Sequence, residues 1–292
     1  MATSSQHVHF TSYSKLRLEW IEKQKIADVK DRLQGTFIID PIEDKDGKLL
    51  LVRVYLSDVQ AYYVEVRARI GVDAKLDRRM RMGVLVIFWD GRLDPKEGGV
   101  IVMDSHPNSY SSSTPWAELF DAPFSLGRNE TSAFINREKN LSIIALSKIG
   151  HPYKIMISDT ASGEKAIEAN SIIGRAEEAI AKAEGESRLK GLDEARGQLS
   201  KATSAYAEGQ FLNSIPAAKS AIEFANAATK AVQTTTTAAT APTTSPTKTD
   251  VTPSAMSPNT LILSVAAIGV LVSIGALVAL RRTKRNPAPS SS

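Results

Sequence analysis

The sequence predicts an α+β multidomain chain: a mainly-β, sandwich- or barrel-like N-terminal domain, an Ala-rich helical hairpin or bundle, a disordered Thr/Pro linker and one transmembrane helix. Three observations predict this order. Short runs rich in Val, Ile, Leu and Tyr recur through residues 1–160 and are bounded by turn residues, as strands are. Apolar residues recur every three to four positions over residues 161–232, which is helical spacing. Near the C-terminus, an uncharged apolar run of about 20 residues has the length of a membrane span.

The first domain, residues 1–160, is expected to be built from short strands. Asp46-Gly47 is a typical tight-turn pair, so we expect it to join Phe37–Ile42 to Leu49–Leu56 as a hairpin. Ser14–Glu22 is expected to form a short helix that leads into the sheet. The expected strands are Gly35–Ile42, Leu49–Leu56, Ala61–Ile70, Gly83–Trp89, Val100–Asp104, Leu141–Ser147 and Tyr153–Ser158.

Residues 161–232 are expected to form amphipathic helices that begin at Ser162, a favourable N-cap. Glycines at 185, 191 and 209 divide the segment into three helices. Ala205–Phe211 is similar to the helix junction of tetratricopeptide-type repeats, but no second copy is evident. We therefore favour an Ala-rich helical spacer over a peptide-binding repeat.

The C-terminal part is expected to be a stalk, an anchor and a tail. Residues 233–259 are rich in Thr, Ser, Pro and Ala, a composition that stays disordered and offers hydroxyls for O-glycosylation. Residues 260–280 are the expected span. Basic residues beside a span stay in the cytoplasm. The sequence therefore predicts a single-pass protein of the cell membrane, with its N-terminal part extracellular and residues 281–292 a cytoplasmic tail. The residues that determine this topology are Arg281, Arg282, Lys284 and Arg285.

Charge and cysteine content exclude several classes of function. The chain has 36 Lys and Arg against 32 Asp and Glu. Without the four basic residues of the tail, the two signs balance, which argues against a nucleic-acid partner. The sequence contains no Cys. Disulfides, a thiol nucleophile and Cys-based zinc sites are therefore impossible.

Motifs for catalysis are not evident in the sequence. The four histidines form no HExxH pair, and neither a GxSxG elbow nor a glycine-rich phosphate loop occurs. We therefore expect no catalytic residue, no metal ligand and no cofactor in this chain. Asn129-Glu-Thr131 and Asn140-Leu-Ser142 are sequons, so Asn129 and Asn140 are candidates for N-glycosylation.

Several stretches of residues 1–160 together resemble the region after the catalytic domain of immune inhibitor A-like secreted metalloproteases. The segment HFTSYSKLRLEWI from His9 is similar to a segment just beyond that family's active-site helix, except for Glu19 where the family has Gly. The most specific match is Ala61–Asp90. Phe120–Gly127 and the strands near residues 141 and 153 are similar to the family's closing strands. The matching positions are Tyr62, Tyr63, Glu65, Arg67, Gly71, Asp73 and Gly83.

The resemblance implies a post-catalytic region without the HExxH helix, so zinc is expected only if a catalytic domain lies upstream. The matching Tyr, Glu, Arg and Asp residues are interpreted as a structural network rather than substrate contacts. Residues 1–15 also lack the features of a signal peptide, and we expect the natural start to lie upstream of Met1.

Two hypotheses for the function follow. The chain is the non-catalytic C-terminal portion of a metalloprotease-like surface protein, partnered by a protease domain, or it is a stand-alone cell-surface binding module that recognises another surface protein.

Overall fold

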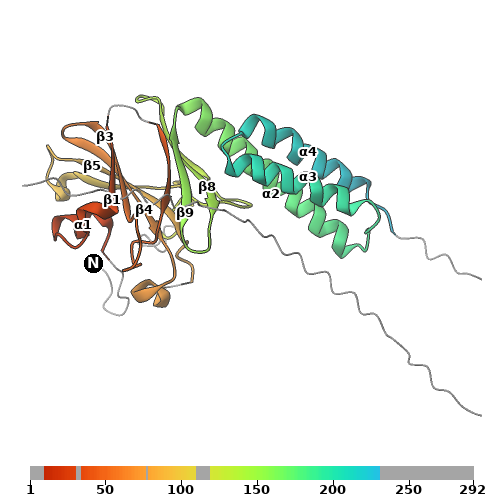
Figure 1. Cartoon of the computed structure of the whole chain (residues 1–292), viewed down its shortest axis with the longest axis horizontal. Helices are drawn as coiled ribbons and strands as arrows, with labels where there is room; N and C mark the ends of the chain where they lie inside the picture. The colour runs from red at the N-terminus through yellow and green to blue at the C-terminus, as the bar shows by residue number, and fades with distance from the viewer. Residues whose placement is uncertain (1–9, 31–33, 77, 110–118, 231–292) are drawn as a thin grey trace, which may run out of the picture. The chain divides into compact units, whose positions relative to one another are not determined.

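Two β-sheets and a layer of helices make up the described part of the chain. The structure is a computed structural model that describes residues 10–30, 34–76, 78–109 and 119–230 (Figure 1). The described residues all belong to one compact unit, which ends at Thr234.

The first sheet is mixed, with strand order β1-β3-β4-β5-β6. β1 runs parallel to β3, and the remaining neighbours are antiparallel. The strands are rich in β-branched and aromatic residues, which favour extended backbone. Their bounds are β1 Ile26–Val29, β3 Leu51–Ser57, β4 Gln60–Arg67, β5 Gly83–Asp90 and β6 Val100–Met103.

The second sheet is antiparallel, with strand order β2-β9-β8-β7. β2 comes from early in the chain, so the sheet joins segments more than 100 residues apart in sequence. The bounds are β2 Gly35–Ile39, β7 Ala133–Asn136, β8 Leu141–Lys148 and β9 Tyr153–Ser158.

The main apolar core lies between the two sheets. Because side chains alternate along a strand, Val54 and Val64 of the first sheet meet Ile143 and Ile155 of the second. Val54, Val64 and Ile155 are fully buried, and Ile143 is nearly so. Each such side chain contributes about 1.5–3 kcal/mol through removal from water.

Three helices follow the second sheet and form a bundle that packs at one end on the other face of this sheet: α2 Thr160–Gly185, α3 Leu192–Ala207 and α4 Phe211–Ala227 (green to blue in Figure 1). Ile144 and Leu146 of β8 pack into a second core with apolar residues of these helices. The N-cap of α2 is Asp159, whose carboxylate accepts a hydrogen bond from Ser162 N. The N-cap expected at Ser162 is therefore wrong by three residues.

The outer face of the first sheet is covered in part by the N-terminal segment. The short helix α1 Ser12–Arg17 places Tyr13 and Leu16 against the cluster that contains Tyr63 and Ile87. Three single-turn 3₁₀ helices complete the described elements: η1 Lys23–Lys25, η2 Gly71–Lys75 and η3 Pro95–Glu97.

The fold-class prediction of a mainly-β domain with a transmembrane helix is corrected. The architecture is mixed: one sheet contains a parallel pair, and helices pack directly on the other sheet. Within the described ranges, no helix is both long enough and apolar enough to cross a membrane. The expected stalk, span and tail, residues 233–292, lie outside the described residues.

The expected hairpin at Asp46-Gly47 is also wrong. The chain turns there, and Gly47 N donates to Asp44 O at 3.1 Å. The flanking strands then separate, because β2 pairs with β9 and β3 pairs with β1 and β4. The turn carries the chain from one sheet to the other.

Candidate functional site

The two tyrosines of the family-like pattern lie on β4 and point to opposite faces of the first sheet. Tyr62 enters the core between the sheets, where its hydroxyl accepts a hydrogen bond from Asn136 Nδ2 at 2.8 Å. Tyr63 packs edge-on against Tyr13 and Trp89 on the outer face. Burial raises the pKa of both phenols. Both side chains are almost completely buried, so their surroundings are those of core residues.

Glu65, Arg67 and Asp73 of the same pattern meet in a buried ionic cluster. Arg67 Nη1 lies 3.3 Å from Glu65 Oε1, and Arg67 Nη2 lies 2.7 Å from Asp73 Oδ2. The backbone N–H of Ser12 donates to the second Glu65 oxygen. Both carboxylates are fully buried, so breaking one partner would leave an uncompensated charge in the interior. The cluster ties β4 to α1 and η2.

The two glycines of the pattern serve the backbone around this cluster. Gly71 adopts a φ of +55°, which glycine tolerates best. At Gly83, a Cβ atom would lie 2.5 Å from the carbonyl oxygen of Phe124. That oxygen accepts the Val84 N–H at 2.9 Å, so a larger residue at 83 would disturb this backbone contact.

A basic pocket opens beside the ionic cluster. Its volume is about 350 Å³, and it lies where the end of β4 meets the β8–β9 turn. The described residues that line it include five basic side chains and no acidic one. They are Arg67, Ala68, Arg69, Arg78, Met80, Met82, Lys148 and His151.

Backbone carbonyls fix the wall of the basic pocket. The Arg69 guanidinium donates to the carbonyls of Leu76 and Met80, each at 2.8 Å, and these bonds hold the segment between η2 and β5. The pocket thus has two kinds of cation. Arg67 and Arg69 are anchored in the wall, whereas Arg78 and Lys148 are exposed at the surface.

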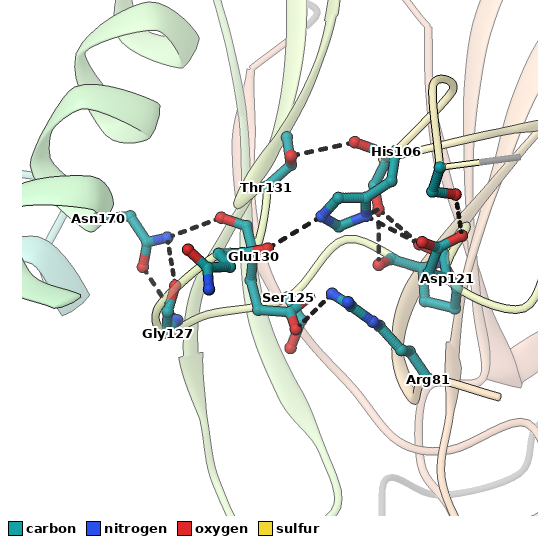
Figure 2. A network of polar contacts seen from close by, with 12 residues as sticks. Arg81, His106, Asp121, Ser125, Gly127, Glu130, Thr131 and Asn170 are labelled. Carbon is teal, nitrogen blue, oxygen red and sulfur yellow. Dashed lines mark hydrogen bonds and ion pairs between the residues drawn. The ribbon is translucent and has the colours of Figure 1, made fainter. Parts of the chain in front are cut away.

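A polar network braces the same segment from the other side (Figure 2). Arg81 forms an ion pair with Glu130 at 2.7 Å. The side chain of Asn170, on α2, accepts from Gly127 N at 3.2 Å and donates to the carbonyls of Gly127 and Glu130. His106 joins this loop to a neighbouring one, since its Nε2 lies 3.0 Å from the Asn129 carbonyl oxygen. The network therefore connects α2 to the segment that lines the basic pocket.

Ser105, His106 and Asp121 lie together in this network, but their geometry differs from a hydrolytic triad. His106 Nδ1 is 2.7 Å from Ser105 Oγ, yet its other nitrogen faces a backbone carbonyl rather than a carboxylate. The Asp121 carboxylate accepts from Ser109 Oγ instead. Ser105 Oγ lies within hydrogen-bond distance of the Asp121 and Pro123 carbonyls. The hydroxyl is enclosed by acceptors, and the group joins two loops rather than presenting a nucleophile.

The candidate glycosylation sites lie in turns. Asn129 and Asn140 both adopt positive φ, 61° and 46°, and both are exposed. The Asn140 side-chain oxygen accepts a hydrogen bond from Thr160 N at 3.2 Å. Glycosylation of either residue stays a prediction. The four basic residues expected to set the topology, from Arg281 to Arg285, lie outside the described residues.

Comparisons with known proteins do not assign the chain to a family. No protein-family model, no curated protein and no solved structure matches the chain. The resemblance to immune inhibitor A-like proteases therefore stays a prediction. Over the described ranges, no group of three or more His, Cys, Asp or Glu side chains is placed to hold a metal ion.

The basic pocket was missed by the sequence interpretation, which balanced charge over the whole chain. A local signal was present. Between Arg67 and Met82 the sequence carries six Lys and Arg residues against two Asp. A charge count over short windows would have found this half of the pocket. Lys148 and His151 come from a segment more than 60 residues away, and only the pairing of the strands brings them to it.

Proposed function

We propose that this chain is a non-catalytic binding module that captures an anionic group in the basic pocket. The observation that carries the proposal is a pocket of about 350 Å³ whose described lining has five basic side chains and no acidic one. This volume is within the range of about 300–1,000 Å³ that small-ligand sites occupy. The proposal corresponds to the binding-module hypothesis from the sequence.

Charge counting supports an anionic ligand. The buried carboxylates of Glu65 and Asp73 both pair with Arg67, whereas the Arg69 guanidinium donates to the neutral carbonyls of Leu76 and Met80. Arg78 and Lys148 still add positive charge at the exposed rim of the pocket. Guanidinium and ammonium groups bind carboxylate and phosphate oxygens through charge-assisted hydrogen bonds. The ligand class is therefore an oxyanion: a carboxylate, a phosphate or a sulfate.

The lining also indicates how the anion is oriented. Arg67 and Arg69 are held in place by hydrogen bonds and ion pairs within the protein, so little side-chain entropy is lost when a ligand binds to that wall. Met80, Met82 and Ala68 supply an apolar surface beside the cations. A ligand with a small apolar part next to its oxyanion fits this division better than a bare ion.

The test is calorimetric titration of the whole chain with inorganic phosphate and, separately, with butyrate, whose carboxylate carries a small apolar part. We expect at least one to bind, with an affinity that falls as salt is raised because the rim charges are screened. Lys148→Gln and Arg78→Gln are each expected to weaken binding about ten-fold. A hydrogen bond to a charged group contributes about 1.5–3 kcal/mol, and 1.4 kcal/mol corresponds to ten-fold.

Arg175→Gln is the matched control, because Arg175 is an exposed arginine on α2 and removing it changes the net charge by the same amount. It is expected to leave binding unchanged. The proposal fails if neither anion binds at millimolar concentration. It also fails if the control weakens binding as much as the two pocket variants do.

A further inference from the structure

A second cavity lies against the N-terminal helix, and its chemistry differs from that of the basic pocket. Its volume is about 400 Å³. Its walls come from the end of α1, the following turn, η1 and the turn between β2 and β3. The polar and aromatic residues of its lining are Lys15, Trp20, Glu22, Lys25, Glu43, Asp44 and Lys45.

Trp20 is the unusual residue of this cavity. Its exposed fraction is 59%, although a Trp side chain gains more than most from burial. Phe10, 51% exposed, packs edge-on against it with ring centroids 5.5 Å apart. Leu18 is also exposed nearby in sequence. Exposed apolar side chains that are grouped in this way often mark a binding surface.

The backbone holds Trp20 in this exposed position. Glu19 adopts a φ of +57°, and Trp20 N donates to the Lys15 carbonyl at 2.8 Å, so the chain reverses directly after α1. The next residue, Ile21, is 5% exposed and packs with Ile42 and Leu50 in the core. The indole is therefore presented by a fixed main chain rather than by a free end.

The charged groups of the cavity balance. Three lysines, Lys15, Lys25 and Lys45, stand against three carboxylates, Glu22, Glu43 and Asp44. The ammonium of Lys15 donates to the Ile42 carbonyl at 2.8 Å and to Glu43 at 3.2 Å, and that of Lys25 donates to the Lys45 carbonyl at 2.8 Å. An ionic ligand would meet charge of its own sign as often as the opposite sign. Closely spaced donors and acceptors suit a neutral ligand with many hydroxyl groups.

We propose that this cavity binds a neutral sugar ring. The C–H face of a pyranose lies flat on an indole, whose π-face carries partial negative charge. The ring hydroxyls, which both donate and accept, then reach the carboxylates and ammonium groups around the cavity. A single sugar or the end of a glycan is the occupant that uses the aromatic wall and the balanced charges together. The site is separate from the basic pocket and does not depend on the function proposed for it.

The test uses tryptophan fluorescence and affinity electrophoresis of the whole chain. The probes are glucose, galactose, mannose and N-acetylglucosamine in solution, and a neutral glucan cast in the gel. We expect at least one sugar to change the fluorescence saturably or the glucan to retard the protein. Trp20→Ala is expected to weaken binding at least ten-fold. Phe224→Ala, which truncates a 42% exposed aromatic residue on α4, is the matched control and is expected to bind as the wild type does.

A second variant guards against a folding defect in Trp20→Ala. Glu22 has a side chain 59% exposed, so Glu22→Ala is expected to fold normally and to weaken sugar binding several-fold. Lys148→Gln, in the basic pocket, is expected to leave sugar binding intact. The inference is overturned if no neutral sugar binds, if both cavity variants bind as the wild type does, or if a quaternary ammonium ion binds on Trp20 while sugars do not.

Discussion

Replacement of Gly163 by Ala tests whether α2 is seated on the second sheet as the structure shows. A Cβ atom at this position would lie 2.6 Å from Ser142 Cβ and 3.0 Å from Ile135 Cγ1. Ser142 is fully buried on β8, and its hydroxyl donates to the Asp159 carbonyl, so it has no room to yield. Overpacking of this kind costs about 1–3 kcal/mol, whereas the better helix propensity of Ala returns at most about 1 kcal/mol. We expect a net loss of up to about 2 kcal/mol.

Gly197→Ala is the matched control for this prediction. Gly197 lies within α3, and a Cβ atom there would meet nothing within 4 Å. The helix-propensity gain should then appear alone, as a stabilisation of up to about 1 kcal/mol. In a unit of this size, 1 kcal/mol shifts the melting temperature by about 2–4 °C. Thermal and urea unfolding of both variants should therefore give shifts of opposite sign. If Gly163→Ala is as stable as Gly197→Ala, the close contact between α2 and β8 is wrong.

Three further predictions concern groups with defined partners. Tyr206 is buried, its pKa is raised by burial, and its hydroxyl donates to the Ala145 carbonyl. The free energy of unfolding should therefore fall above about pH 10, where the phenol ionises in the unfolded chain before it ionises in the folded one. Tyr206→Phe should cost about 1 kcal/mol at pH 7 and should flatten this fall, as measured by urea unfolding from about pH 7 to 11. The hydrogen bond from Ser162 N lowers the pKa of the Asp159 carboxyl, so the stability that this N-cap contributes is present at neutral pH and is lost below about pH 4. Asp159→Asn should keep the cap but remove this acid-dependent loss of stability. The prediction is contradicted if the variant loses stability in acid as the wild type does. Asn170→Ala should weaken phosphate binding as well as stability, because its three hydrogen bonds brace the loop that pairs with the pocket segment; calorimetry showing unchanged affinity would refute that link.

Strand positions were predictable from composition, whereas strand partners were not. Each expected strand segment contains a strand, since runs of Val, Ile and Tyr bounded by turn residues report local backbone preference. The short strands β1 and β7 gave no comparable signal and were missed. The Asp46-Gly47 turn shows the limit most clearly. A tight turn fixes the local path of the chain but not the strand partners: β3 pairs with β1 and β4, and β2 pairs with β9.

In the candidate sites, too, residues close in sequence could be singled out from the sequence, whereas features that depend on the three-dimensional path of the chain could not. Glu65, Arg67 and Asp73 were singled out from a short stretch of sequence, and the structure brings them together. Their interpretation as a structural network remains a prediction. Trp20 lay in a segment that was expected to be a plain helix, and its exposure follows from the reversal at Glu19, which no composition rule predicts.

A series of contacts connects the helices to the basic pocket, which a plain spacer would not require. Asn170 on α2 holds the loop that ends at Glu130, and Glu130 holds Arg81. Arg81 lies within the segment whose neighbours Arg78 and Met80 line the pocket. The first step is a hydrogen bond of 3.1 Å, the second is an ion pair of 2.7 Å, and the third follows the covalent chain from Arg81 to its neighbours. Because α2 also buries Ile172 and Ala166 on the second sheet, the helical layer fixes one end of this series of contacts to the core. The position of Arg78 at the rim of the pocket therefore depends on helix packing.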